Sequence, residues 1–241
     1  MDAIGIIPAR FHSTRFEGKV LADINGKPMI QHVWERARQA KLLDDLIVAC
    51  DDERIYKVVK EFGGNAIFTA KGHASGTDRI TEIANPLEVK IVLNIQADEP
   101  MLHPSIIDSI IESLKMDETL SVATVIKKIE HPEEINDSNV VKVVIDKNNF
   151  ALYFSRLPIP FIRDEQNQEM VYYKHLGIYG YTKDFLFTYK NLPQSRLEKL
   201  EKLEQLRILE NGYRIKVVET KFETYGVDTP QDLLKVRGLV K

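Results

Sequence analysis

The sequence predicts an α/β fold built around a mostly parallel central sheet. Three short runs of apolar, mainly β-branched or aromatic residues, at residues 4–7, 46–50 and 66–68, have the pattern of buried strands. Amphipathic segments at residues 29–40 and 53–62 separate these runs, so that strands and helices alternate along the chain. Such alternation is typical of a doubly wound parallel sheet with helices on both faces.

The middle of the chain departs from this alternation. Further strands are expected at residues 90–96, 120–125, 175–181 and 215–218, and helices at residues 104–114, 196–210 and beyond 230. From about 127 to 174 the pattern changes, and residues 140–145 and 150–154 have the pattern of a hairpin. The apolar, proline-rich segment 157–161 follows. We expect an antiparallel insert whose apolar surface serves self-association.

Composition excludes several classes of protein. The chain has 241 residues, enough to bury a substantial core, and a net charge of −3, which does not indicate nucleic-acid binding. Its single cysteine, Cys50, cannot form an internal disulfide and fits a reducing compartment. No apolar run approaches the roughly 18 residues of a membrane span, and no basic leader precedes the first strand. We expect a cytoplasmic protein without membrane insertion.

A basic loop follows the first predicted strand, which we expect Pro8 to close. This loop carries Arg10, Arg15 and Lys19 at the edge of the sheet where open α/β folds bind ligands. Arginine forks and lysine suit phosphate oxygens, although a solvated basic loop is an equally good interpretation of this segment alone. A Walker A loop would need Ser or Thr where Val20 stands, and no Gly-x-Gly-x-x-Gly follows the strand.

Two further strand ends carry candidate ligand-binding residues. Asp98 follows the strand at residues 90–96, where a carboxylate could bind a metal, although such an aspartate is more often a turn residue. Gly76 would let the backbone approach a ligand closely. Ser75 and Thr77 could equally well be caps of the helix that begins near Asp78.

The predicted helix at 196–210 contains a carboxylate, that of Glu204, on its apolar side. Its five leucines recur every third residue and cover about two-thirds of the helix circumference. Glu204 falls within that apolar arc, and burial of a carboxylate is costly unless it is paired or faces a cleft. His175 lies in the strand at 175–181, where a hydrogen-bonded core histidine is the commoner case.

Ten short motifs occur in order over essentially the whole chain. They include Ile6-Ile-Pro-Ala-Arg10, Ser75-Gly-Thr-Asp-Arg79, Gln96-Ala-Asp-Glu-Pro100, His175-Leu-Gly-Ile-Tyr-Gly180, Leu203-Glu-Gln-Leu-Arg207 and Gly226-Val-Asp-Thr-Pro230. Each motif is weak alone, but together they closely resemble the 3-deoxy-manno-octulosonate cytidylyltransferase (CMP-KDO synthetase) family. That family transfers the cytidylyl group of CTP to the sugar acid KDO and releases pyrophosphate, which activates KDO for lipopolysaccharide assembly.

The resemblance implies a Rossmann-like nucleotidyltransferase fold in one domain over residues 1–241, a Mg²⁺ cofactor and a homodimer formed through the insert. It assigns catalysis to Lys19, Arg10, Asp98 and Asp228, with Asp98 and Asp228 as the metal ligands. It assigns nucleotide binding to Pro8, Ala9, Arg10, Arg15, Lys19, Thr69, Ala70, Ser75, Gly76 and Asp98. It assigns the sugar side to Arg79, Gln96, His175, Tyr179, Glu204 and Gln205, with Arg79 on the sugar carboxylate.

Two positions depart from the family pattern, and two other functions stay open. Glu17 stands where the family often has proline, and Ala97 replaces a usual glycine. Neither change removes a proposed ligand, but Glu17 puts a negative charge near the phosphates. The sugar could be an 8-amino analogue of KDO or another acidic sugar. A catalytically silent nucleotide-binding paralogue is the alternative from a different class.

Overall fold

A nine-stranded sheet forms the centre of the computed structural model, which describes residues 1–13, 15–73, 75–163 and 171–240. Its main path runs in the order β11-β7-β10-β6-β1-β4-β5. The strands are β1 (Ala3–Ala9), β4 (Asp45–Cys50), β5 (Ala66–Phe68), β6 (Ile91–Asn94), β7 (Val122–Lys128), β10 (Tyr173–Thr182) and β11 (Lys216–Glu219). All pairings along this path are parallel except those of β10, which runs antiparallel to β6 and β7. The predicted α/β fold with a mostly parallel sheet is therefore confirmed.

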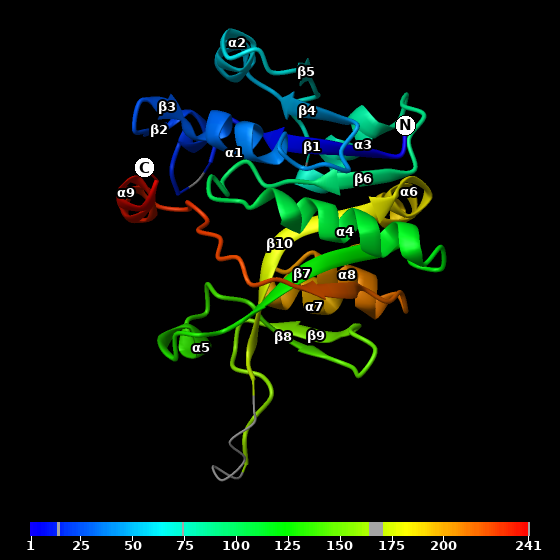
Figure 1. The fold of residues 1–241 in the computed structure, drawn as a ribbon. Coiled ribbons are helices and arrows are strands. Elements are labelled where there is room, and N and C mark those ends of the chain that lie inside the picture. Colours follow the sequence, from blue (N-terminus) through cyan, green and yellow to red (C-terminus); the bar gives the residue numbers. More distant parts are fainter. Residues whose placement is uncertain (14, 74, 164–170, 241) are drawn as a thin grey trace.

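Helices cover both faces of the sheet (Figure 1). One face packs against α1 (Met29–Ala37), α2 (Glu53–Glu61) and α4 (Pro104–Met116). The other packs against α3 (Gly76–Ala84), α6 (Lys183–Asn191) and α8 (Gln205–Glu210). The short 3-10 helix η1 (Lys19–Leu21) and the small pair β2 (Asp23–Ile24) and β3 (Lys27–Pro28) connect β1 to α1. The alternation of strands and helices thus forms two apolar cores around one sheet.

The first strand is buried on both faces, as its apolar run predicts. Ile4 and Ile6 belong to one core and Ile7 to the other, because side chains alternate along a strand. The expectation that Pro8 closes the strand is wrong by one residue. Pro8 lies opposite Ala49 in the parallel ladder, and β1 ends at Ala9.

Strand β10 passes very close to helix α4 at Gly180. A Cβ atom on Gly180 would clash with Ile110 and would lie 3.0 Å from Leu114, whereas one on Gly177 would meet nothing closer than 3.8 Å. The ladder between β10 and β7 also shifts register between Leu176 and Tyr179. The interior glycines of this strand therefore mark both a bulge and a close approach, as expected.

Replacing Gly180 by alanine should destabilise the protein because α4 must move away from the sheet. We expect Gly180→Ala to lower the free energy of unfolding by about 1–3 kcal/mol, the usual range for overpacking. Gly177→Ala in the same strand is the matched control and should cost less. Thermal or urea unfolding of the two variants would check this, and equal stability would contradict the packing argument.

The insert is a hairpin attached to the long strand β10. Strands β8 (Lys142–Ile145) and β9 (Ala151–Ser155) pair antiparallel, and β8 also pairs with the start of β10. The short helix α5 (Glu133–Asn136) precedes them, and these elements lie in the lower part of the molecule in Figure 1. The predicted hairpin is confirmed, whereas residues 164–170 of the predicted insert lie outside the described residues.

The segment 196–210 is two helices, so the prediction of one continuous helix is wrong. Helix α7 (Arg196–Glu201) ends at Lys202, which adopts a left-handed conformation with φ of 55°, and α8 begins at Gln205. The regular leucine spacing concealed this break. Leu200, which the single-helix prediction placed in the apolar arc, is 67% exposed. Because of the break, Glu204 is not in the middle of a helix. It is the residue immediately before α8 begins.

A small third core holds the end of the chain against its beginning. Val227 and the helix α9 (Pro230–Leu239) pack with Ile24 and Met29, so residues 220–229 run from β11 back across the sheet edge. Figure 1 shows this segment in orange, passing from the sheet to α9. Within the described part of the chain, no helix is long and apolar enough to cross a membrane.

Candidate active site

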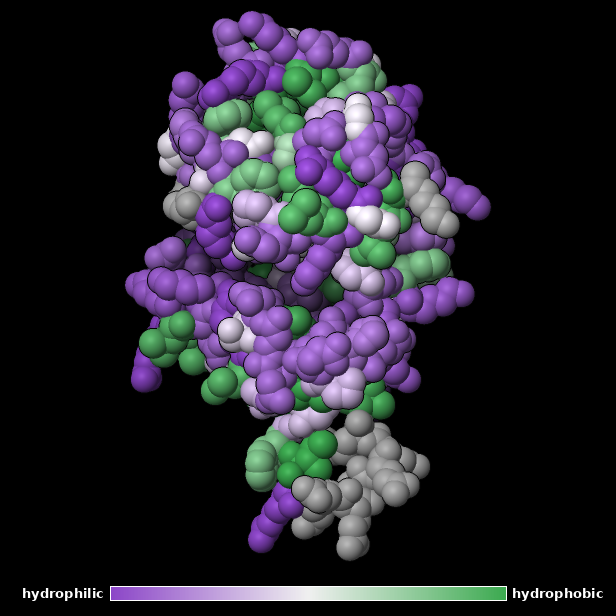
Figure 2. Space-filling model, turned by 90° about the vertical axis from the view of Figure 1, so that its left-hand side faces the viewer, coloured by the Kyte–Doolittle hydropathy of each residue, from purple (hydrophilic) through white to green (hydrophobic). Residues whose placement is uncertain are grey.

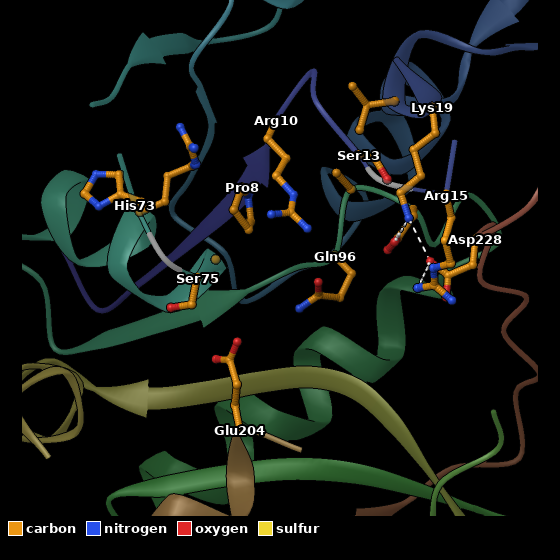
Figure 3. Close-up of a pocket in the computed structure, with 15 residues that line it drawn as sticks. Pro8, Arg10, Ser13, Arg15, Lys19, His73, Ser75, Gln96, Glu204 and Asp228 are labelled. Carbon is orange, nitrogen blue, oxygen red and sulfur yellow. Dashed lines mark hydrogen bonds and ion pairs between the residues drawn. The ribbon is translucent and has the colours of Figure 1, made fainter. Parts of the chain in front are cut away.

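The basic loop after β1 folds so that Lys19 points into a cavity. Gly18, in the left-handed region with φ of 66°, donates its backbone N–H to the Phe11 carbonyl over 2.9 Å. A side chain at position 18 would also press against the Phe11 ring. Lys19 then begins η1, and Arg15 lies nearby on the same loop (Figure 3). Thr14 lies outside the described residues.

Lys19 bridges two carboxylates that arrive from distant parts of the chain. Its Nζ lies 2.5 Å from Asp98 Oδ2 and 3.0 Å from Asp228 Oδ1. It also donates to the Val227 carbonyl over 3.2 Å. Arg15 Nη2 lies 2.9 Å from the same Asp228 oxygen. The cationic loop, the end of β6 and the segment before α9 therefore meet at one point.

The positive charge of Lys19 and the negative charges of Asp98 and Asp228 stabilise one another. Burial would lower the pKa of Lys19, whose side chain is only 13% exposed, but the charges and hydrogen bonds of Asp98 and Asp228 outweigh burial and raise it. Lys19 therefore stays protonated, and both carboxylates have cationic partners.

A cavity of about 320 Å³ opens in front of this cluster. Figure 2 shows a hollow at mid-height of the molecule, bordered mainly by hydrophilic residues. The residues that line the cavity are Pro8, Arg10, Ser13, Arg15, Lys19, Val20, His73, Ser75, Gly76, Arg79, Gln96, Ala97, Asp98, Glu204 and Asp228. In Figure 3, Arg10 and Glu204 approach the cavity from opposite sides. A volume of this size and its several cations suit a small anionic ligand.

Seven of the ten residues expected to bind nucleotide line this cavity, and the other three do not. Ala9 is buried in the apolar core. Thr69 donates its hydroxyl to the Cys50 carbonyl over 3.1 Å, and the backbone N–H of Ala70 is bonded to Glu82 over 3.1 Å. Ser75 caps α3, which confirms its structural interpretation, and still faces the cavity. Ala74, beside Ser75, lies outside the described residues.

Arg79 lines the first cavity together with two other sugar-side candidates, Gln96 and Glu204. Its guanidinium is 2.8 Å from Asp51 Oδ2 and also donates to Thr69. Only 4% of the Arg79 side chain is exposed. Its assignment to the sugar carboxylate therefore stays a prediction.

A second cavity, of about 380 Å³, adjoins the first. It contains the other five sugar-side candidates, Gln96, His175, Tyr179, Glu204 and Gln205. Both cavities share Gly76, Gln96 and Glu204, so a ligand in one would lie beside a ligand in the other. The hypothesis that Glu204 faces a cleft is consistent with this placement.

Two ionisable groups of the second cavity, Glu204 and His175, have pKa values shifted from their ordinary ones. Glu204 is exposed at the cavity, and desolvation by the groups around its carboxyl raises the pKa, although a hydrogen bond from Thr77 opposes this. Burial lowers the pKa of His175 to about 3, so this imidazole is neutral near pH 7. Its Nε2 lies 2.9 Å from the Thr124 hydroxyl. A neutral histidine and a carboxyl with a raised pKa provide donors and acceptors for sugar hydroxyls.

Two cations that line the second cavity, Arg156 and Lys202, were not among the site residues predicted from the sequence. Arg156 follows β9 and donates to the Glu201 carbonyl over 2.7 Å, and Lys202 occupies the break between α7 and α8. Continuous helical periodicity hid Lys202. Arg156 ends Ala151-Leu-Tyr-Phe-Ser-Arg156, another of the ten family motifs, which could have pointed to it. Glu17, whose charge was expected near the phosphates, pairs with His12 at 3.2 Å on the surface.

The first cavity contains two carboxylates that could serve as Mg²⁺ ligands. Among the described residues, no group of three or more His, Cys, Asp or Glu could hold a metal ion. Asp98 and Asp228 nevertheless face one cavity and share Lys19 as a partner. Mg²⁺ usually binds through one or two carboxylates together with water and substrate phosphates. Two carboxylates beside a loop that carries Arg10, Arg15 and Lys19 fit that requirement.

Known proteins resemble this chain over its whole length. A family model described as cytidylyltransferase matches residues 4–216. The 3-deoxy-manno-octulosonate cytidylyltransferase of Solibacter usitatus is 52% identical, covering 99% of this chain and 94% of the relative. The one of Geobacter sulfurreducens is 48% identical over the full length of both. A solved CMP:2-keto-3-deoxy-manno-octonic acid synthetase complexed with CTP superimposes with a TM-score of 0.93 at 44% identity, covering 99% of this chain and 98% of that one.

The fold and the site together define a nucleotidyltransferase. A 4-diphosphocytidyl-2C-methyl-D-erythritol synthase from Anaerococcus prevotii, 14% identical with a TM-score of 0.64, shares the fold alone. The full-length relatives are more specific, and this chain belongs to the 3-deoxy-manno-octulosonate cytidylyltransferase family.

Proposed function

We propose that this enzyme transfers the cytidylyl group of CTP to the anomeric hydroxyl of KDO and releases pyrophosphate. The observation that carries this proposal is the pair of adjoining cavities. One has Arg10, Arg15 and Lys19 beside two carboxylates, and the other has hydrogen-bonding groups suited to a sugar together with the cations Arg156 and Lys202. The relatives' names and the structure complexed with CTP support the choice of both substrates.

Positioning and charge stabilisation are the tasks of the side chains in this reaction. Arg10, Arg15 and Lys19 would bind the triphosphate and stabilise the charge that collects on the departing pyrophosphate. Gln96 and Glu204, which border both cavities, would orient the sugar so that its hydroxyl faces the α-phosphorus. Gln205, His175 and Tyr179 would hold the rest of the sugar.

Asp98 and Asp228 would hold Mg²⁺ in this proposal. When bound, the ion would supply Lewis-acid stabilisation of the phosphate oxygens. Lys19 and Arg15 now neutralise the two carboxylates, and their cationic groups would turn to the phosphates once nucleotide binds. The exchange would keep each of these charges paired.

Incubation with CTP, Mg²⁺ and a panel of sugar acids, with pyrophosphate as the readout, would test the function. We expect the highest kcat/KM with KDO. A higher value with the 8-amino analogue or with a sialic acid would instead assign the enzyme to that sugar. Absence of pyrophosphate with every sugar acid would support a silent nucleotide-binding protein.

We also propose that the insert forms a homodimer interface. Leu157 and Phe161, which follow the hairpin, are 70% and 87% exposed, and Leu152 on β9 is 60% exposed. Figure 2 shows hydrophobic residues at this lower end of the molecule. Exposed apolar groups gathered on one attachment are typical of an association surface.

A charge in this apolar group should dissociate the dimer, because a carboxylate cannot be buried there unpaired. We expect light scattering to show a dimer at micromolar concentration for the native protein and a monomer for Phe161→Asp. Leu234→Asp is the matched control, because Leu234 is similarly exposed at 64% but lies on α9. A monomeric native protein would refute the proposed interface.

A further inference from the structure

The segment at residues 220–229 brings Asp228 to the site without a helix or strand of its own. Near each end, its backbone is hydrogen-bonded to another part of the chain. Thr220 donates to the Ile126 carbonyl and Val227 to the Asp98 carbonyl, each over 2.9 Å. Side-chain anchors must fix the path between these two hydrogen bonds.

Glu223 is the charged anchor in this interval. Its Oε1 lies 2.7 Å from Lys174 Nζ, and its Oε2 lies 3.2 Å from Lys127 Nζ. These lysines are opposite each other on β7 and β10, and their side chains are only 3% (Lys127) and 8% (Lys174) exposed. Each carboxylate oxygen of Glu223 therefore lies within ion-pair distance of a different buried ammonium group, and the two attractions together restrict the position of the side chain.

The two lysines do not depend on Glu223 alone for a counter-charge. Glu130 lies 2.9 Å from Lys127, and Glu134 lies 2.6 Å from Lys174, both from the start of the insert. Satisfying the buried ammonium groups therefore does not by itself require a carboxylate from the C-terminal segment. The distinctive property of Glu223 is that it connects that segment to the sheet.

The chain between Glu223 and Asp228 has little freedom to absorb a displacement. At Gly226, a Cβ atom would lie 3.2 Å from Glu99 Oε1, so the backbone is in close contact with that side chain. Val227 is fully buried in the third core. Only four residues separate Glu223 from Asp228, so movement of the first would be transmitted to the second.

We propose that Glu223 is a positioning residue, which holds Asp228 where its carboxylate meets Asp98 across Lys19. The proposal rests on the proposed function, in which these two carboxylates share Mg²⁺ with the nucleotide. Glu223 contacts neither cavity and acts only through the chain that it anchors.

Glu134 offers a matched control for Glu223. Both side chains are 23% exposed, and both pair with Lys174, but Glu134 belongs to the insert. The measurement is titration calorimetry of Mn²⁺ into the protein saturated with CTP, together with the midpoint of thermal unfolding. We expect Glu223→Gln to weaken Mn²⁺ binding about 10- to 100-fold, as removal of outer-shell partners does. Glu134→Gln should lower the unfolding temperature to a similar extent and leave Mn²⁺ affinity near the native value.

The variant Asp228→Asn shows whether Glu223 acts through Asp228. In that background, Glu223→Gln should cause no further loss of Mn²⁺ affinity, because the ligand that it positions is already absent. Should Glu223→Gln fail to fold, Glu223→Asp keeps the charge but shortens the side chain, and it should weaken Mn²⁺ binding to an intermediate extent.

Three results would overturn the inference alone: native Mn²⁺ affinity in a folded Glu223 variant, equal weakening by Glu134→Gln, or a further loss when Glu223→Gln is added to Asp228→Asn. Native affinity in Asp228→Asn itself would remove Asp228 from the proposed metal site, and the inference with it.

Discussion

Asp98→Asn and Asp228→Asn should each reduce turnover by about a thousandfold, which corresponds to several kcal/mol of lost charge stabilisation. Each change removes one anionic ligand from the proposed Mg²⁺ site and one partner of Lys19, with almost no change in side-chain size. Steady-state rates of pyrophosphate release, measured at saturating CTP and KDO over a range of Mg²⁺ concentrations, would check this.

The asparagine variants should remain folded, because both carboxylates lie at the cavity surface and not in a core. Asp184→Asn on α6 is a suitable control, since Asp184 is exposed and lines neither cavity. Near-native turnover of either site variant, at every Mg²⁺ concentration, would remove that residue from the metal site.

Lys19→Met should be nearly as damaging, but with a different signature. Loss of the ammonium group should reduce kcat/KM for CTP by about 100- to 1,000-fold, as loss of one preorganised charge-stabilising group does. In the absence of CTP, the same variant should bind Mn²⁺ more tightly than the native protein, because Lys19 no longer occupies the space between Asp98 and Asp228.

The opposite signs of these two effects make the test specific to Lys19. Lys27→Met removes an ammonium group that is paired with Glu35 at 2.8 Å on the surface, and it should change neither quantity. If Lys19→Met left Mn²⁺ affinity without CTP unchanged, Lys19 would not compete with the metal, and the proposed exchange of partners would be wrong.

The sequence predicted most of the fold because its signals are local. The strand from Ala3 to Ala9 is a continuous apolar run, and helix α1 has an apolar stripe. The break at Lys202 escaped prediction, because a left-handed lysine has no sequence signal comparable to glycine and the leucine spacing continues through it.

The site was less accessible to prediction than the fold. Strand ends indicated Asp98 and the basic loop, but only the resemblance to a family brought in Asp228, which is 130 residues further along the chain. The pairing of Arg79 with Asp51 was invisible, because it depends on how helix α3 and the residue after β4 meet in space. Local patterns identify candidate residues, whereas their partners follow from tertiary structure.

The ion pairs of Lys19 set the charge balance of the site before any substrate binds. Lys19 and Arg15 carry two positive charges, and Asp98 and Asp228 carry two negative ones, so the cluster is electroneutral before any ligand arrives. Like-charged groups that would repel one another in an empty site are thereby held together by the protein itself. The cost of assembling them is met during folding, so that the binding energy of nucleotide and sugar is available for the reaction.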